Sequence, residues 1–404
     1  MERKLKLGIA SMGVSLLLGS TFANAEVALN AQGVQYGSFT FVPAVKATVG
    51  YDDNVYNFSG TEIGSWYAGV APQFVWIAQD RNNTYQIVYG LDGRTYSHRS
   101  DDSYLDQNLG LKAHLEPNAR LRLDGGLGYK MQHDARGSGR SAGYQWLPNA
   151  KTGSISAMGE VDKYDVASLT AGFEYGAKDA AGMLLGSVGL DSKGYDRDLV
   201  ANGRDNDRKN MALGFHVRLM PKTKATIELE HVDTDYDGAT ADTVDDRYYV
   251  GLLWENTVQT TGKARFGQSK RKVKSAAGTS DGDKFSWDVG LNWSPLERDM
   301  VTFVTGRAIA DAEDTGATSL NTNYGIQWKH QWLDRLNTEL GYGINKSEYA
   351  TRDDDSKKYR IAANYQMRRW LVLSCELDMT DRNSDDPAFD TKRNIYAIGA
   401  QLSL

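Results

Sequence analysis

Hydrophobic and polar residues alternate along most of this chain with a period of two, the pattern of a β-strand with two unlike faces. In the final stretch, residues 392–404, one parity is apolar to the last residue and the other is small or polar. The apolar set is Tyr396, Ile398, Ala400, Leu402 and Leu404, and the other is Ala397, Gly399, Gln401 and Ser403. An open strand edge invites aggregation unless it is paired, and closing a barrel pairs every edge. The stretch therefore predicts the closing strand of a β-barrel.

The same alternation recurs in segments of about ten residues, the length that a tilted strand needs to cross a bilayer. It is clearest in a predicted hairpin, where residues 105–115 and 121–131 are joined through Glu116-Pro117-Asn118. Eighteen such segments can be assigned, at 45–52, 74–78, 85–91, 105–115, 121–131, 169–173, 184–190, 213–219, 225–229, 248–254, 264–266, 285–293, 301–303, 324–328, 340–344, 359–365, 371–379 and 392–404.

The connections between these segments alternate in length, as expected of a barrel with both ends in the periplasm. Short turns are predicted at 80–83, 116–118, 221–223, 294–299 and 368–369, and longer loops at 53–65, 135–161, 196–208, 237–245, 273–282 and 381–390. We expect loop 135–161, the longest, to be the one loop large enough to fold inward as a constriction.

Aromatic residues are sorted by connection length, which fits two belts at the membrane–water interfaces. Tryptophans lie beside short turns (Trp76, Trp254, Trp293, Trp332, Trp370), and tyrosines lie beside long loops (Tyr51, Tyr96, Tyr104, Tyr195, Tyr236, Tyr349, Tyr359). The predicted fold is therefore all-β, an up-and-down antiparallel transmembrane barrel of about eighteen strands over residues 41–404.

The N-terminus predicts export. Arg3, Lys4 and Lys6 precede an apolar run over residues 7–18, and residues 23–25 fit a small-x-small cleavage site, so residues 1–25 are interpreted as a secretory signal peptide. Residues 26–40 lack alternation and are expected to form a periplasmic lead-in. Removing Glu2, Arg3, Lys4 and Lys6 takes a net +2 from the total of −6, which leaves the mature chain near −8. Such an acidic protein is a poor candidate for binding nucleic acid.

Two stretches resemble a known family. They are Val49 to Tyr56 (VGYDDNVY) and Tyr129 to Gly139 (YKMQHDARGSG), supported by Tyr104-Leu105-Asp106. Together they resemble the putative beta-barrel porin 2 family of Gram-negative outer-membrane proteins, whose members are commonly associated with exopolysaccharide or capsule operons. For Asp52, Asn54, Asp134 and Arg136, turn or strand-end hydrogen bonding is the simpler interpretation.

An eighteen-stranded barrel is wide enough for an aqueous channel, so its inward parity carries the functional prediction. The candidate pore-lining residues are Lys46, Arg94, Lys112, Arg122, Asp124, Lys130, Arg218, Glu228, Glu230, Arg265, Lys329, Glu339 and Arg360. Neither sign dominates, which suits a neutral or weakly charged glycan or a nonselective path. Pairing of these charges across strands, simply to rigidify the interior, explains the composition equally well. Inward Tyr96 and Tyr249 could supply flat faces against sugar rings.

No recognised catalytic, cofactor or metal-binding motif is present, so no enzymatic activity is expected. The sequence and the resemblance together predict a passive outer-membrane conduit in exopolysaccharide or capsular polysaccharide secretion. The alternatives are a general diffusion porin and a surface receptor or structural barrel without transport. Expected partners are outer-membrane lipids and lipopolysaccharide, the barrel assembly machinery, exopolysaccharide, and periplasmic polysaccharide-export proteins. Cys375 is expected to be a small apolar residue facing lipid.

Overall fold

The structure is a computed structural model that describes residues 33–404 except 61, 99, 137–160, 197–202, 239, 256–258, 276–277 and 312–317. The predicted signal peptide, residues 1–25, lies outside the described residues. Among the described residues there is no helix long and apolar enough to cross a membrane.

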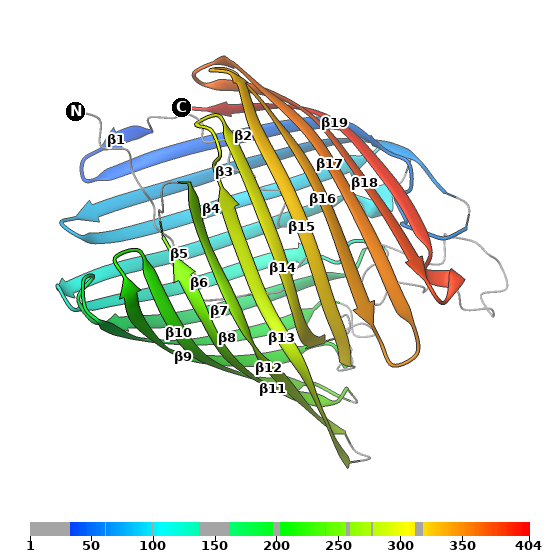
Figure 1. The fold of residues 1–404 in the computed structure, drawn as a ribbon. Helices are drawn as coiled ribbons and strands as arrows, with labels where there is room; N and C mark the ends of the chain where they lie inside the picture. The colour runs from blue at the N-terminus through cyan, green and yellow to red at the C-terminus, as the bar shows by residue number, and fades with distance from the viewer. Residues whose placement is uncertain are drawn as a thin grey trace.

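Eighteen antiparallel strands form one closed barrel, in which each strand pairs with the next along the chain and the last pairs with the first (Figure 1). The predicted fold class and strand number are confirmed. The strands are β2 Phe39–Asp52, β3 Ser65–Asp80, β4 Asn83–Tyr96, β5 Tyr104–Asn118, β6 Leu121–His133, β7 Lys163–Tyr175, β8 Gly182–Tyr195, β9 Asn206–Met220, β10 Thr223–Tyr236, β11 Asp242–Trp254, β12 Thr260–Ser275, β13 Gly278–Trp293, β14 Asp299–Asp311, β15 Thr318–Leu333, β16 Leu336–Glu348, β17 Asp353–Arg368, β18 Leu371–Ser384 and β19 Thr391–Ser403.

The barrel closes between β19 and β2, which pair from Ile395 with Asp52 to Ser403 with Ala44. Below this ladder, the short strand β1 (Val34–Tyr36) pairs with the start of β2, and the Gly33 amide donates to the Leu404 carbonyl at 3.3 Å. The first strand thus begins at residue 39, two residues before the predicted start of the barrel. Part of the expected lead-in over residues 26–40 is therefore a hairpin, formed by β1 and the start of β2 next to the C-terminal residue Leu404.

The two faces of the wall differ as the alternation predicts. Large apolar side chains on one parity are exposed to the outside, among them Leu109, Leu127, Phe215, Val250 and Ile398. In the described part of the chain nothing packs over these side chains, as expected of a barrel surface that faces lipid. Charged and small residues occupy the opposite parity, so the functional chemistry of the barrel lies on its inner face.

One predicted loop is a pair of extended strands instead. Residues 273–282 were expected to form a long connection, but β12 and β13 continue as a hairpin until Ser275 pairs with Gly278. Within the described residues, β13 pairs with β14 only from Trp287 to Trp293, so residues 278–286 extend beyond this ladder, whereas β12 stays paired with β11 as far as Lys274. Residues 278–284 are glycine or polar on both parities, which removes the alternation that marks a membrane strand.

Candidate functional site

One part of the inner face is a network of ion pairs on β10 to β13. The guanidinium of Arg265 contacts both Glu228 and Glu230, and it donates to Asp288 through Nη2 at 2.6 Å. Lys263 also donates to Asp288, at 2.5 Å. Since Arg265 and Glu228 are nearly buried, this pairing offsets the cost of removing both charges from water.

A second network links the strands on either side of the closing seam. Arg360 on β17 donates to Asp378 and to Glu376 on β18, each at 3.0 Å. Lys46 on β2 donates to the other oxygen of Glu376 at 2.7 Å. Charges on three strands therefore cancel across the wall and hold the strands in register.

The inner face of β4 to β9 is different, because much of it is glycine or small. Gly110 pairs with Gly128 on β6, and Lys112 pairs with Gly126. A Cβ built on Gly110 would have no heavy atom within 4 Å, which places open space in front of this position. At these glycines the wall presents its backbone to the lumen.

A loop folds against the inside of the barrel. It is the loop after β2, in which Asn54, Val55 and Tyr56 are only 0, 2 and 4% exposed. Val55 packs with the inward-facing Tyr67 and Tyr96. The sequence predicted an inward fold for loop 135–161, of which residues 137–160 lie outside the described residues. The view that this longer loop alone could fold inward is wrong, since the shorter loop does so.

The two stretches that carry the family resemblance meet at this loop. Arg136 donates to Asp102 at 2.6 Å and its guanidinium lies 5.6 Å from the centre of the Tyr56 ring. Asp134, beside it, accepts from Arg204 at 2.9 Å. These contacts are ion pairs between separate segments of the chain, so local turn hydrogen bonding is an incomplete account of Asp134 and Arg136.

Residues at the start of the loop fasten β2 to β19. Arg393 Nε donates to both carboxylate oxygens of Asp52, at 3.0 and 3.1 Å, and Asp52 is fully buried. Asn394 donates to Asp53 from its backbone and its side chain, at 2.6 Å in each case. Asn54 Nδ2 donates to the Lys392 carbonyl at 2.9 Å. We call Asp52, Asp53, Asn54, Arg393 and Asn394 the seam cluster.

Tyr96 and Tyr249 do not offer faces to a sugar. Both are on the inward parity, but they are only 5 and 4% exposed. Tyr96 packs against Tyr67, with ring centroids 5.7 Å apart, and the Arg265 guanidinium covers the Tyr249 ring at 4.9 Å. The interpretation of these two rings as stacking platforms is wrong because protein already covers them.

The thirteen pore-lining candidates occupy the strand parity opposite the exposed apolar side chains. Ten of the thirteen have an acidic or basic side chain within 4.0 Å. Lys46, Glu228, Glu230, Arg265 and Arg360 belong to the two networks described above. The other five are Arg122 with Glu174, Asp124 with His114, Arg218 with Asp179, and Lys329 with Glu339, where both members are candidates. The three that remain, Arg94, Lys112 and Lys130, have no carboxylate oxygen within 4.0 Å in the described part of the chain. Arg94 instead lies 4.2 Å from the centre of the Tyr67 ring.

Sequence reasoning missed some inward charges. The missed residues are Arg271 and Asp245, which form a buried pair at 2.6 Å, and Arg208, which lies on the inner face beside the already assigned Asp191. Their positions follow the same alternation as the assigned residues. Arg271, for example, is six residues after Arg265 on the same strand, so both face the lumen. Extending the alternation past the apolar band would have found them.

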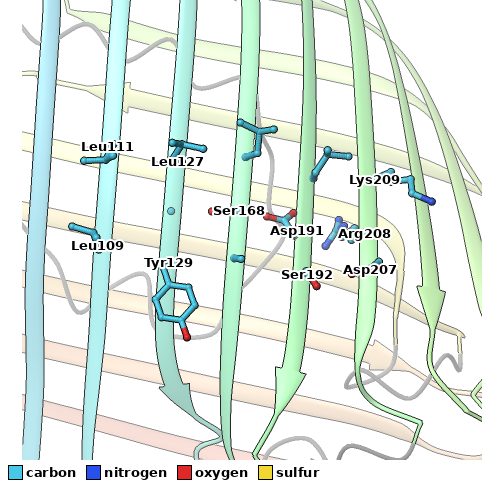
Figure 2. A pocket seen from close by; sticks show the side chains of 14 residues that line it. Leu109, Leu111, Leu127, Tyr129, Ser168, Asp191, Ser192, Asp207, Arg208 and Lys209 are labelled. Carbon is cyan, nitrogen blue, oxygen red and sulfur yellow. The ribbon is translucent and has the colours of Figure 1, made fainter.

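A groove of about 620 Å³ lies over β5 to β9, and Figure 2 shows Leu109, Leu111, Leu127 and Tyr129 along it. Most of its lining has the outward parity, so the groove continues the lipid-facing surface and is not part of the lumen. No group of three or more potential metal ligands occurs among the described residues.

Comparisons with known proteins agree with this architecture. A family model described as "Putative beta-barrel porin 2" matches residues 27–404. The chain is similar to the FrpB iron transporter of Neisseria meningitidis (F5-1 variant, apoprotein form), with 11% identity and a TM-score of 0.52 over 87% of this chain and 62% of that chain. It is also similar to Pseudomonas aeruginosa OpdK with vanillate, with 9% identity and a TM-score of 0.50 over 90% and 99% of the two chains.

These identities show a shared fold alone, and the chain spans less than two thirds of the FrpB chain. A comparison with curated protein sequences found no match.

Proposed function

Because the chain belongs to the family described as Putative beta-barrel porin 2, a group of porin-like outer-membrane β-barrels, we propose that it is a passive conduit for a glycan. The cargo would be a neutral or weakly charged exopolysaccharide or capsular polysaccharide. The glycan component rests on the association of the family with polysaccharide operons, and the conduit component rests on the lumen.

The observation that carries the proposal is the inner surface itself. Most of the inward charges assigned from sequence have a partner of opposite charge within 4.0 Å, and the wall from β4 to β9 includes inward glycines such as Gly110, in front of which the lumen is open. Such a surface neither attracts a strongly charged polymer nor obstructs a hydrated one.

The barrel would perform no chemistry in this role. Synthesis of the polymer and periplasmic export proteins would supply direction, and the lumen would supply a polar path through the bilayer. The assembly machinery would insert the chain by its C-terminal strand, and lipopolysaccharide would surround its outer end.

A complementation experiment tests the proposal. A deletion strain should lose extracellular polysaccharide and regain it with the wild-type gene. The variant Gly110→Trp/Lys112→Trp places two bulky rings in the lumen, whereas Leu109→Trp/Leu111→Trp places them on the lipid face of the same strand. We expect only the inward pair to reduce release, measured as polysaccharide in the culture medium. Normal release from the deletion strain would remove the glycan hypothesis.

A general diffusion porin is the second candidate, favoured by the open space in front of Gly110. Such a porin would conduct ions steadily in planar bilayers, whereas a dedicated exporter should stay mostly closed without its partners. A surface receptor, the third class, would keep its function when the lumen is blocked by the inward tryptophan pair.

A further inference from the structure

Three inward cations differ from the rest of the lumen charges. They are Lys112 on β5, Lys130 on β6 and Arg208 on β9, and all three are exposed. In the described part of the chain, none of them has a carboxylate oxygen within 4.0 Å, unlike the paired arginines of β12, β17 and β19. Their charge is therefore available to a solute.

The register places these cations on one wall. Lys130 pairs with Asn108, two residues from Gly110, and Lys112 lies two residues from Gly110 on the other side. Further round the same wall, Arg208 pairs with Asp191 on β8. Because residues two apart on a strand share a face and lie about 7 Å apart, Lys112 and Lys130 both lie near the open space at Gly110.

The acidic residues on this wall only partly balance the cations. Asp191 lies between Lys130 and Arg208 and interacts electrostatically with both. Asp124 accepts from His114 at 2.7 Å, and Asp106 accepts from His133 at 2.8 Å, but a hydrogen bond from a neutral imidazole leaves the negative charge of a carboxylate in place. Asp92 on β4 is a further inward carboxylate of this wall. On the inward parity of β4 to β9, seven lysines and arginines therefore stand against six aspartates and glutamates, which leaves an excess of one positive charge.

We propose that Lys112, Lys130 and Arg208 form an anion-contact strip along the glycine-rich wall of the lumen. This inference rests on the proposed conduit function and narrows its cargo to solutes that carry scattered carboxylate or phosphate groups, such as a weakly anionic glycan. The strip is discontinuous and includes Asp191 beside Arg208, so it attracts anionic groups weakly and does not bind them tightly.

The electrostatic effect is large enough to measure. A unit cation about 7 Å from a passing anion, at the dielectric constant of water, raises the local anion concentration roughly threefold and lowers that of a cation by the same factor. At about 0.01 M salt the screening length is about 30 Å, so most of this effect survives.

A cysteine probe at Gly110 tests the strip directly. The variant Gly110→Cys is made in the full-length chain with Cys375→Ser, which removes the one native thiol. In reconstituted vesicles, its rate of reaction is measured with an anionic sulfonate-bearing thiosulfonate and a cationic trimethylammonium-bearing thiosulfonate. We expect the ratio of anionic to cationic rates to fall by roughly 20- to 50-fold when Lys112→Gln and Lys130→Gln are added. The thiol readout does not require the channel to conduct.

A charge-matched control separates local from global effects. Lys346→Gln/Lys357→Gln removes two lysines that have the outward parity on β16 and β17, and the rate ratio should stay unchanged. A ratio that is equally insensitive to the inward and outward pairs would overturn the strip while leaving the conduit intact. A probe at residue 110 that reacts with neither reagent would overturn both, because the lumen would then be closed to water.

Discussion

Removing the carboxylate of Asp52 should loosen the closing seam of the barrel more than any comparable change at its surface. Asp52 is fully buried and receives two hydrogen bonds from Arg393 Nε, which lies 341 residues away in sequence. Asp52→Asn keeps the shape of the side chain but leaves the guanidinium without its counter-charge. Breaking one partner of a buried ion pair costs about 3–5 kcal/mol.

This cost converts into a measurable temperature shift. Unfolding entropy of about 2.1 cal/mol/K per residue, over roughly 370 residues, gives about 0.8 kcal/mol/K, so the transition should fall by about 4–6 °C. The assay is the temperature at which the detergent-solubilised barrel loses its folded mobility on unboiled gels.

The control and the double variant make the result specific. Asp80→Asn removes the same charge at an exposed strand end of β3 and should leave the transition unchanged. Asp52→Asn/Arg393→Gln should lose less than the single Asp52→Asn, since removing both partners leaves no uncompensated charge. If Asp52→Asn melts with the wild type, the seam cluster does not stabilise barrel closure.

Three other substitutions test separate parts of the account. Val250→Lys, on the outer apolar band, should cost about 2–4 kcal/mol in folding titrations into lipid vesicles, whereas Lys112→Gln on the inner face should cost almost nothing; equal costs would contradict the assignment of faces. Arg265→Met leaves Glu228 buried without its cation and should destabilise the barrel by about 3–5 kcal/mol in the same titration, a loss that an unchanged midpoint would refute. Tyr56→Ala removes the ring beneath Arg136 and should raise single-channel conductance in planar bilayers by freeing the inward loop; an unaltered conductance would show that this loop does not narrow the path.

The strands themselves could be predicted from sequence because their cause is local. In a barrel wall every residue faces either lipid or the lumen, so the period of two follows from the environment of each side chain. Leu105 to Leu115 illustrates this, since its alternation needs no knowledge of its partners. The same logic explains why the number of strands followed from counting apolar segments.

The contacts within the site could not be predicted, because they depend on register between distant segments. Asp52 and Arg393 belong to the first and last strands of the barrel, and only closure brings them together. The partners of Arg265 lie on β13, which is next to its own strand, and on β10, which is two strands away, so the contacts require the alignment of several ladders. An inventory of inward charges cannot distinguish such paired residues from Lys112 and Lys130.

Two features could not be predicted from the alternation of apolar and polar residues. Residues 278–282 of the β12–β13 hairpin are glycine or polar on both parities, so the sequence pattern predicted a loop there instead of a strand. Tyr96 and Tyr249 have the correct parity for lumen residues, but their burial depends on a folded loop and on Arg265. Parity shows which side of the wall a residue lies on, and packing decides whether solvent reaches it.

The claim on which the whole account depends is that the barrel has lipid outside and water inside. Spin labels placed one at a time along residues 107–113 of β5, in a Cys375→Ser background, report contact with oxygen, which concentrates in lipid, and with a water-soluble nickel chelate. We expect oxygen maxima at Leu109 and Leu111 and chelate maxima at Gly110 and Lys112, so that the two profiles alternate along the strand. Two reagents that rise and fall together along β5, or that show no alternation, would contradict it.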